Sequence, residues 1–175
     1  MYAKSYIAIE EPDLTRLKTP RPAHPARRFV DGYLAALLAR ASHLISAEFH
    51  AVVKRHGLSV SEWRTLATLS DGVEISIGEL ARITLNKQPT LTRLLDRMER
   101  RGELRRVPHR RDGRITLIRI TAQGRRTVAH LIGLAEEHEQ RVLQPFGRAR
   151  SNQLKSTLRG IIALHPGPPR RGQAT

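Results

Sequence analysis

The region between Ser76 and Thr121 constrains the fold most, because it predicts two short helices joined by a tight turn. Ser76 precedes Glu79 at capping-box spacing, which starts a helix at Ser76. Residues 84–87 show no lasting apolar period and contain a polar turn residue. Beyond them, apolar side chains at helical spacing predict a second helix with one buried stripe. The stripe consists of Leu91, Leu94, Leu95 and Met98.

The opposite face of the second helix is polar and basic. A helix that presents such residues from its N-terminal part, after a short helix and a tight turn, is typical of a helix-turn-helix that reads a DNA major groove. A proline in the first turn suits this position, because it removes only an amide without a helical partner. A basic face alone fits a solvated surface equally well. The residues of this face and of the first turn are Lys87, Gln88, Pro89, Thr90, Arg93, Arg97 and Arg100.

A β-hairpin follows and favours the DNA interpretation. Gly102 is predicted to cap the second helix in a left-handed conformation. Residues 104–107 and 115–120 are predicted strands, and the loop between them has no large apolar side chain. Such a hairpin beside a reading helix suits the minor groove, whose negative potential attracts arginine. Its arginines are Arg110, Arg111 and Arg114, and Asp112 is expected to orient Arg114 or Arg111 through a charge-assisted pair.

The predicted fold class is therefore mainly α, an α+β winged helix-turn-helix with six helices and a two-stranded β wing. Residues 1–28 are predicted to form a flexible N-terminal arm, and residues 29–57 a long dimerisation helix. The DNA-binding lobe spans residues 58–121, beginning with a second capping box at Ser59 and Glu62. Thr121 is expected to cap the first of the C-terminal dimerisation helices in residues 122–165, and residues 166–175 are expected to be a disordered tail.

Composition narrows the function further. A formal charge of +15 over 175 residues indicates an anionic partner, and the basic excess is concentrated between Lys87 and Arg114. No apolar run approaches a membrane span and no signal peptide is apparent, so we expect a cytoplasmic protein that binds double-stranded DNA rather than a membrane. Without cysteine, disulfides and thiolate catalysis are excluded. The eight histidines lack metal-ligand spacing and no catalytic motif occurs, so we expect no metal, no cofactor and no enzyme activity.

Six short motifs follow one another between Leu58 and Gly124: EWRTL at 62–66, ELA at 79–81, PTLTRLLDRME at 89–99, GELRR at 102–106, DGR at 112–114 and ITAQG at 120–124. In this order and spacing they resemble the pattern of the MarR (multiple antibiotic resistance regulator) family. Three departures occur: Pro89 replaces a small hydroxyl residue, Glu103 stands where an apolar residue is common, and Ile120 replaces leucine.

The helices outside the lobe have apolar stripes that the remaining sequence is too short to cover, which predicts a homodimer. The resemblance implies the same dimer, and a crevice between the dimer helices and the lobe that takes small aromatic acids. Trp63, with His43 or His50 as a hydrogen-bond donor, is expected to line that crevice, although Trp63 fits a core position equally well. A small aromatic carboxylate is the expected effector.

We therefore expect a homodimeric, ligand-responsive repressor with a pseudo-palindromic operator. Two alternatives remain: a sequence-tolerant architectural or RNA-binding winged-helix protein, and a module that binds another regulator. The residues expected to contact DNA are Lys87, Gln88, Thr90, Thr92 and Arg93 at bases and nearby phosphates, with Pro89 beside them, Arg97, Arg100 and Arg106 at phosphates, and Arg110, Arg111 and Arg114 in the minor groove.

Overall fold

The computed structural model describes residues 28–165, and the chain divides into two compact units between residues 40 and 41. The first unit contains a 3-10 helix, η2 (Phe29–Asp31), and the first turns of α1 (Leu34–Arg55). The long helix predicted from residue 29 therefore begins at Leu34, because the Gly32 amide donates to the Phe29 carbonyl and ends the preceding turn. The predicted arm, apart from Arg28, and the predicted tail lie outside the described residues.

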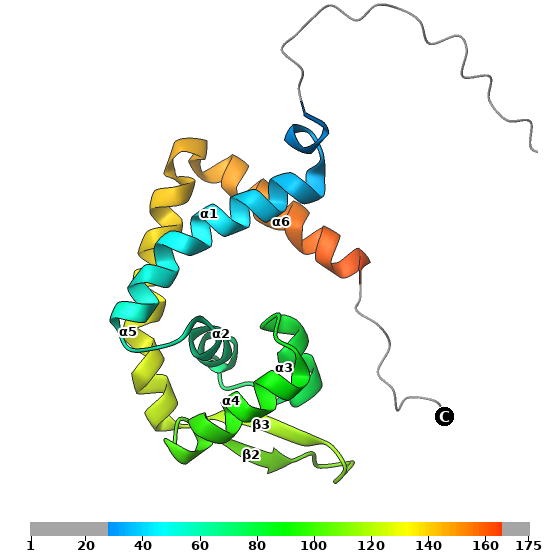
Figure 1. The fold of residues 1–175 in the computed structure, drawn as a ribbon, viewed down its shortest axis with the longest axis vertical. Coiled ribbons are helices and arrows are strands. Elements are labelled where there is room, and N and C mark those ends of the chain that lie inside the picture. The colour runs from blue at the N-terminus through cyan, green and yellow to red at the C-terminus, as the bar shows by residue number, and fades with distance from the viewer. Residues whose placement is uncertain (1–27, 166–175) are drawn as a thin grey trace, which may run out of the picture. The chain divides into compact units, whose positions relative to one another are not determined.

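The second unit begins within α1 and continues through a winged helix-turn-helix to two C-terminal helices (Figure 1). The predicted caps are confirmed: the hydroxyl groups of Ser59, Ser76 and Thr121 each accept a main-chain N–H in the first turn of the helix that follows. The elements are α2 (Val60–Leu69), β1 (Ile75–Ser76), α3 (Ile77–Ile83), α4 (Gln88–Arg100), β2 (Leu104–Pro108), β3 (Thr116–Ile120), α5 (Ala122–Leu143), the 3-10 helix η3 (Gln144–Phe146) and α6 (Gly147–Leu164).

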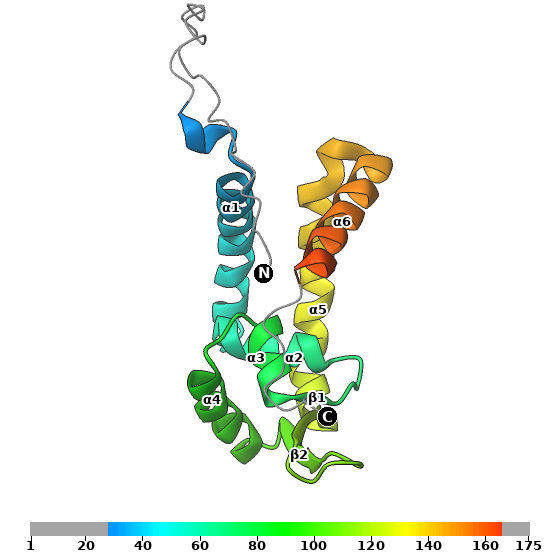
Figure 2. The same cartoon turned by 90° about the vertical axis from the view of Figure 1, so that its right-hand side faces the viewer.

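The sheet has three antiparallel strands in the order β1-β3-β2, so it contains the predicted two-stranded wing and one further, very short strand. β2 and β3 form the hairpin, with Leu104 opposite Ile120 and Pro108 opposite Thr116. β1 adds Ile75 opposite Ile118 on the other edge of β3, at the base of the wing (Figure 2). Because β1 runs directly into α3, this pairing attaches the first helix of the helix-turn-helix to the wing.

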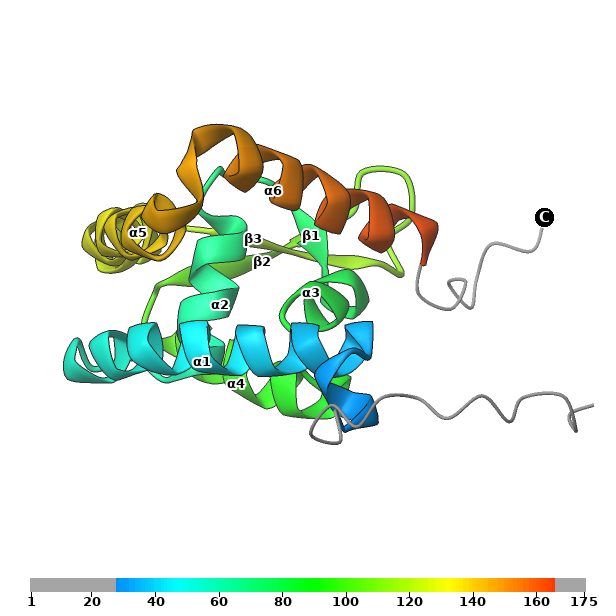
Figure 3. The ribbon, with the colours of Figure 1, turned by 90° about the horizontal axis from the view of Figure 1, so that it is seen from above.

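The core of the second unit lies where α2 meets α3, α4, α5 and β3, and the view from above shows α2 over the sheet (Figure 3). Leu66 of α2, Leu80 of α3 and Ile118 of β3 are all fully buried. The predicted stripe of α4 joins them, because Leu91, Leu95 and Met98 have no exposed surface and Leu94 is 4% exposed. Burial of a side chain of this kind stabilises the fold by about 1.5–3 kcal/mol.

The C-terminal helix, in contrast, leaves much of its apolar surface uncovered. Ser151 is the one buried residue that the structure describes in α6. Leu154 is 48% exposed and Ile162 is 65% exposed, although both belong to the apolar stripe of this helix. Among the described residues, no helix is long and apolar enough to cross a membrane.

The start of α5 is held closely against the beginning of β2. The Thr121 amide donates to the Glu103 carbonyl at 3.0 Å, and Thr121 Oγ1 donates to the Gly102 carbonyl at 2.6 Å. Gly124 lies in this junction, where an added Cβ atom would lie 2.0 Å from the Glu103 carbonyl oxygen and 2.8 Å from Ile120. This contact explains why the position holds a glycine within the helix.

We predict that Gly124→Ala lowers the free energy of unfolding by about 3 kcal/mol or more, because backbone atoms must move to accept the methyl group. Urea denaturation followed by circular dichroism measures the effect. Gly78→Ala in α3 is the matched control, since an added Cβ there meets nothing within 4 Å. A Gly124→Ala variant as stable as the Gly78→Ala variant would contradict the proposed packing of α5 on β2.

Candidate DNA-binding surface

The turn between α3 and α4 has a left-handed residue that the sequence did not reveal. Leu85 has φ 56° and is 81% exposed, and the Asn86 amide donates to the Ala81 carbonyl at 2.9 Å. Asn86 Nδ2 donates to Thr84 Oγ1 at 3.0 Å, and Asn86 Oδ1 accepts from Ser61 of α2 at 3.1 Å. Glycine or asparagine usually occupies such a position, so the leucine gave no turn signal. These bonds fix where α4 begins.

The face of α4 opposite the buried stripe is exposed as expected. Thr92 differs from its neighbours, because it is half-buried and its hydroxyl donates to the Gln88 carbonyl at 3.0 Å. Because the Thr92 hydroxyl donates its proton in this bond, its oxygen can act only as a hydrogen-bond acceptor toward another molecule. The exposed residues of this face are Lys87, Gln88, Pro89, Thr90, Arg93, Arg97 and Arg100.

Arg106 is engaged within the protein. Its guanidinium forms ion pairs with Asp96 at 2.6 Å and with Glu99, both on α4, and its main-chain amide donates to Glu99 at 2.9 Å. Burial lowers the pKa of Arg106, but the hydrogen bonds and charges of the two carboxylates outweigh it and raise the pKa above the usual value. The sequence predicted a phosphate contact, whereas this geometry makes Arg106 a brace between β2 and α4.

The tip of the wing carries the three expected arginines, Arg110, Arg111 and Arg114, all exposed. His109 Nδ1 accepts from the main-chain amides of Arg111 at 3.3 Å and Asp112 at 3.2 Å. Asp112 does contact Arg114, but its carboxylate accepts from the main-chain amide at 3.0 Å. Among the described residues, no ion pair joins Asp112 to a guanidinium, so it shapes the loop backbone rather than orienting a side chain by charge.

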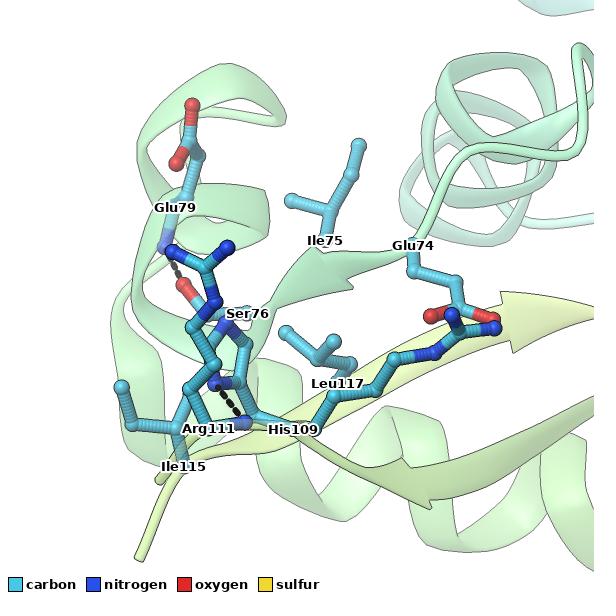
Figure 4. Close-up of a pocket in the computed structure, with 9 residues that line it drawn as sticks. Glu74, Ile75, Ser76, Glu79, His109, Arg111, Ile115 and Leu117 are labelled. Carbon is cyan, nitrogen blue, oxygen red and sulfur yellow. Dashed lines mark hydrogen bonds between the residues drawn. The ribbon is translucent and has the colours of Figure 1, made fainter. Parts of the chain in front are cut away.

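A cleft of about 550 Å³ lies at the base of the wing (Figure 4). Ile75 and Leu117 contribute apolar surface to it, and Ser76 and Glu79 line it from the start of α3. Glu74 is paired with Arg119 at 3.3 Å. His109, Arg110 and Arg111 line the cleft from the wing, so the loop that carries two of the exposed arginines borders α3.

Trp63, one of the expected ligand residues, lies in a group of aromatic rings. Trp63 packs on Phe49 with ring centroids 5.2 Å apart, and Phe49 lies 5.6 Å from the ring of His138. His138 is 8% exposed, and its Nε2 lies 3.2 Å from Glu48 Oε2. Neither His138 nor Phe49 was among the expected ligand residues. The contact joins residues far apart in the chain, so no local pattern could indicate it.

The other two expected ligand residues, His43 and His50, both belong to α1. His43 is exposed on α1 and His50 is half-buried. Burial lowers the pKa of His50, with further lowering by the charges of Arg64 and Lys54. Among the ring contacts of residues 28–165, Trp63 contacts Phe49, and Phe49 also contacts His138. Within residues 28–165, no cluster of three or more histidine, aspartate or glutamate side chains could hold a metal ion.

A helix-turn-helix joined to a β hairpin, with cationic side chains exposed on its second helix and on the hairpin tip, defines a winged-helix DNA-binding protein. The profile of the MarR family matches residues 56–115. The chain is 32% identical over 131 residues to the transcriptional regulator PecS of Dickeya dadantii, covering 73% of this chain and 78% of that protein. The chain belongs to the MarR family of DNA-binding transcription regulators, which are not enzymes.

Two further relatives support this assignment. The chain is 29% identical over 131 residues to the homoprotocatechuate degradative operon repressor of Escherichia coli, covering 75% of this chain and 88% of that protein. The crystal structure of a MarR family transcriptional regulator from Silicibacter pomeroyi superposes with a TM-score of 0.70 at 36% identity, covering 80% of this chain and all of that one.

Proposed function

We propose that this regulator is a homodimeric repressor that binds a pseudo-palindromic operator and is released by a small aromatic acid. The observation that carries the DNA-binding part is the exposure of Arg93 and Arg97 on α4 while the opposite stripe of the same helix is buried. A helix with one buried apolar face and one exposed basic face can enter a major groove, and the wing that follows can reach the neighbouring groove on the same side of the duplex. The relative from Escherichia coli is itself named a repressor.

The division of labour among the site residues is part of the proposal. The residues at the N-terminal cap and in the N-terminal half of α4 are proposed to contact base edges and nearby phosphates. They are Lys87, Gln88, Thr90, Thr92 and Arg93, with Pro89 among them. Arg97 and Arg100 are proposed to contact phosphates, and Arg110, Arg111 and Arg114 to enter the minor groove. Arg106 is proposed to act through α4, because Asp96 and Glu99 occupy its guanidinium.

We predict that Arg93→Ala weakens operator binding by about 1–3 kcal/mol and relaxes the preference at one base pair, whereas Arg111→Ala weakens all sequences evenly and reduces the salt slope. Selection of bound genomic fragments would supply the operator, and fluorescence anisotropy at several salt concentrations would measure both effects. Arg150→Ala on α6 loses the same charge outside α4 and the wing. In protein that sediments with the same stoichiometry as the wild type, this variant should change neither the operator preference nor the salt slope. Equal, sequence-independent losses from both variants would show that α4 does not read bases.

The same titration separates the proposal from a sequence-tolerant architectural or RNA-binding protein. A regulator should keep a preference for its operator over random duplex of about a thousandfold or more. A protein that binds only the phosphate backbone shows no such ratio, because its affinity depends on salt and not on sequence. Failure to bind any promoter fragment at low salt would favour a module that binds another regulator.

The dimer is supported by the uncovered apolar side chains of α6, where Leu154 and Ile162 remain exposed. Isolated exposed leucines are common, but a stripe of them on one helix marks a contact surface. A two-fold dimer would place two copies of α4 about 34 Å apart, matching one turn of the duplex. Residues 29–57 and 122–165 are the segments proposed to form this dimer.

We predict that the double variant Leu154→Glu, Ile162→Glu weakens dimerisation by at least about tenfold, because buried apolar contacts would be replaced by charges. Sedimentation velocity at micromolar concentration would measure the shift toward monomer, and operator affinity should fall with it. Val73→Glu is the control, since Val73 is 46% exposed in the winged-helix unit. Wild-type protein that sediments as a monomer would overturn the dimer.

The proposed effector is a small aromatic carboxylate. The relative from Escherichia coli is named for an operon that degrades homoprotocatechuate, an aromatic acid. In this chain, Trp63, Phe49 and His138 combine aromatic surface with a hydrogen-bonding group, and His43 and His50 of α1 are proposed to contribute polar groups. Such an effector weakens DNA binding only if it prefers the conformation that does not bind DNA.

We predict that an aromatic carboxylate such as phenylacetate changes the fluorescence of Trp63, the single tryptophan of the chain, in a saturable way. The same concentration range should release the operator, because the two equilibria are linked. Acetate is the control, since it carries the charge without the ring. Unchanged fluorescence and unchanged DNA binding at millimolar concentrations of several aromatic acids would contradict this class of effector.

A further inference from the structure

Arg101, at the C-terminal end of α4, joins two carboxylates from other parts of the fold. Its Nη2 donates to Glu62 Oε1 of α2 at 2.6 Å, across 39 positions of sequence. Its Nε and Nη2 also donate to Oε2 of Glu103, the residue before β2, at 3.1 Å and 2.9 Å. The three side chains therefore form one ion-pair network, which we call the Arg101 triad.

The two carboxylates are almost completely buried, whereas the arginine is not. The side chains of Glu62 and Glu103 are 10% and 9% exposed, and that of Arg101 is 46% exposed. A buried carboxylate destabilises a fold unless it is paired and hydrogen-bonded. The second oxygen of Glu62 accepts from the Ser59 amide at 2.8 Å, so both of its oxygens are bonded.

The directions in which the pKa values of Glu62 and Arg101 are shifted agree with this geometry. Burial alone would raise the pKa of Glu62, but the hydrogen bonds from Ser59 and Arg101 outweigh it and hold the pKa below the usual value. The hydrogen bond to Glu62 raises the pKa of Arg101, against the opposing effect of burial and with support from Glu103. The lowered pKa of Glu62 and the raised pKa of Arg101 keep both of these groups charged at neutral pH.

The triad lies where four elements meet. Glu62 belongs to the capping box of α2, Arg101 caps α4, and Glu103 precedes β2. The main-chain carbonyl of Glu103 also accepts the Thr121 amide at the start of α5. Residues 101–103 thus attach the end of α4 to α2 and to the start of α5. Glu103 is also one of the three positions at which the sequence departs from the MarR pattern, and its carboxylate is paired with Arg101 in the triad.

We propose that Arg101 is a positioning residue for DNA recognition: through Glu62 and Glu103 it sets the direction in which α4 leaves the core and enters the groove. This rests on the proposed function, in which α4 reads DNA. The competing role for a partly exposed arginine beside a reading helix is a direct phosphate contact. The two roles differ in what the carboxylates do, because a phosphate contact does not require Glu62 or Glu103.

The decisive variant is Glu103→Gln, because the two roles predict effects of opposite sign. Loss of a negative charge in the DNA-binding lobe strengthens binding to a polyanion if only electrostatics matters. If the triad positions α4, the same variant weakens operator binding by about three- to thirtyfold. Asp71→Asn, in the exposed turn after α2, removes an equal charge outside the triad and should bind as tightly as the wild type or slightly more tightly.

Variants of Arg101 complete the test on the full-length protein. Arg101→Met should weaken operator binding while the salt slope stays constant, and Arg101→Lys should weaken it less, since lysine keeps the charge without the two-sided geometry. Circular dichroism below the melting temperature identifies variants that remain folded. If Arg101→Met does not fold, Glu103→Gln and Arg101→Lys carry the test.

Each outcome of these measurements decides between the roles. Operator binding by Glu103→Gln that equals or exceeds wild-type binding overturns the proposal. So does an Arg101→Met variant whose salt slope falls by about one and whose affinity for all sequences falls evenly, because that identifies a phosphate contact. A lower melting temperature with unchanged affinity also overturns it, since the role is then purely structural. Wild-type protein without any sequence preference overturns the proposed function itself.

Discussion

Burial of one apolar stripe on α4 is the interaction on which the rest of the structure depends. Leu91, Leu95 and Met98 are completely removed from water between α2, α3 and the sheet. Because a helix is rigid, burying these residues fixes the direction of the opposite face, which carries Arg93 and Arg97 into solvent. The core therefore supplies most of the stability of α4 and also determines which side chains are available to a duplex.

Electrostatics adds a second level of organisation around this core. Acidic residues in and next to α4 are paired with arginines: Asp96 and Glu99 with Arg106, and Glu103 with Arg101. These pairs connect α4 to β2, and the further pair between Arg101 and Glu62 connects it to α2, so α4 is held at its C-terminal half. The N-terminal half and the wing tip keep exposed arginines. The charge of the lobe is thus divided between cations that hold the helix in place and cations proposed to contact DNA.

Several features of the fold could be predicted because their signals are local. Capping residues such as Ser59, Ser76 and Thr121 lie within one turn of the amides they bind, so their spacing is visible in the sequence. The left-handed Gly102, with φ 70°, was visible for the same reason. The turn at residues 84–87 was also predicted, but the left-handed conformation of Leu85 was not, because that conformation usually requires glycine. Its neighbour Asn86 is held by the Ala81 carbonyl and, across 25 positions of sequence, by the Ser61 hydroxyl.

By itself, the sequence determined the order of helices and strands, the side of α4 that is buried and the sign of charge on the opposite side, because helical periodicity and hydrophobicity are encoded residue by residue. Only the tertiary structure decided which arginines are engaged within the protein and which remain exposed. It assigned Arg106 and Arg101 to carboxylates and enclosed His138 beside Phe49. Such pairings depend on which distant segments approach one another, and a periodic pattern contains no information about that proximity.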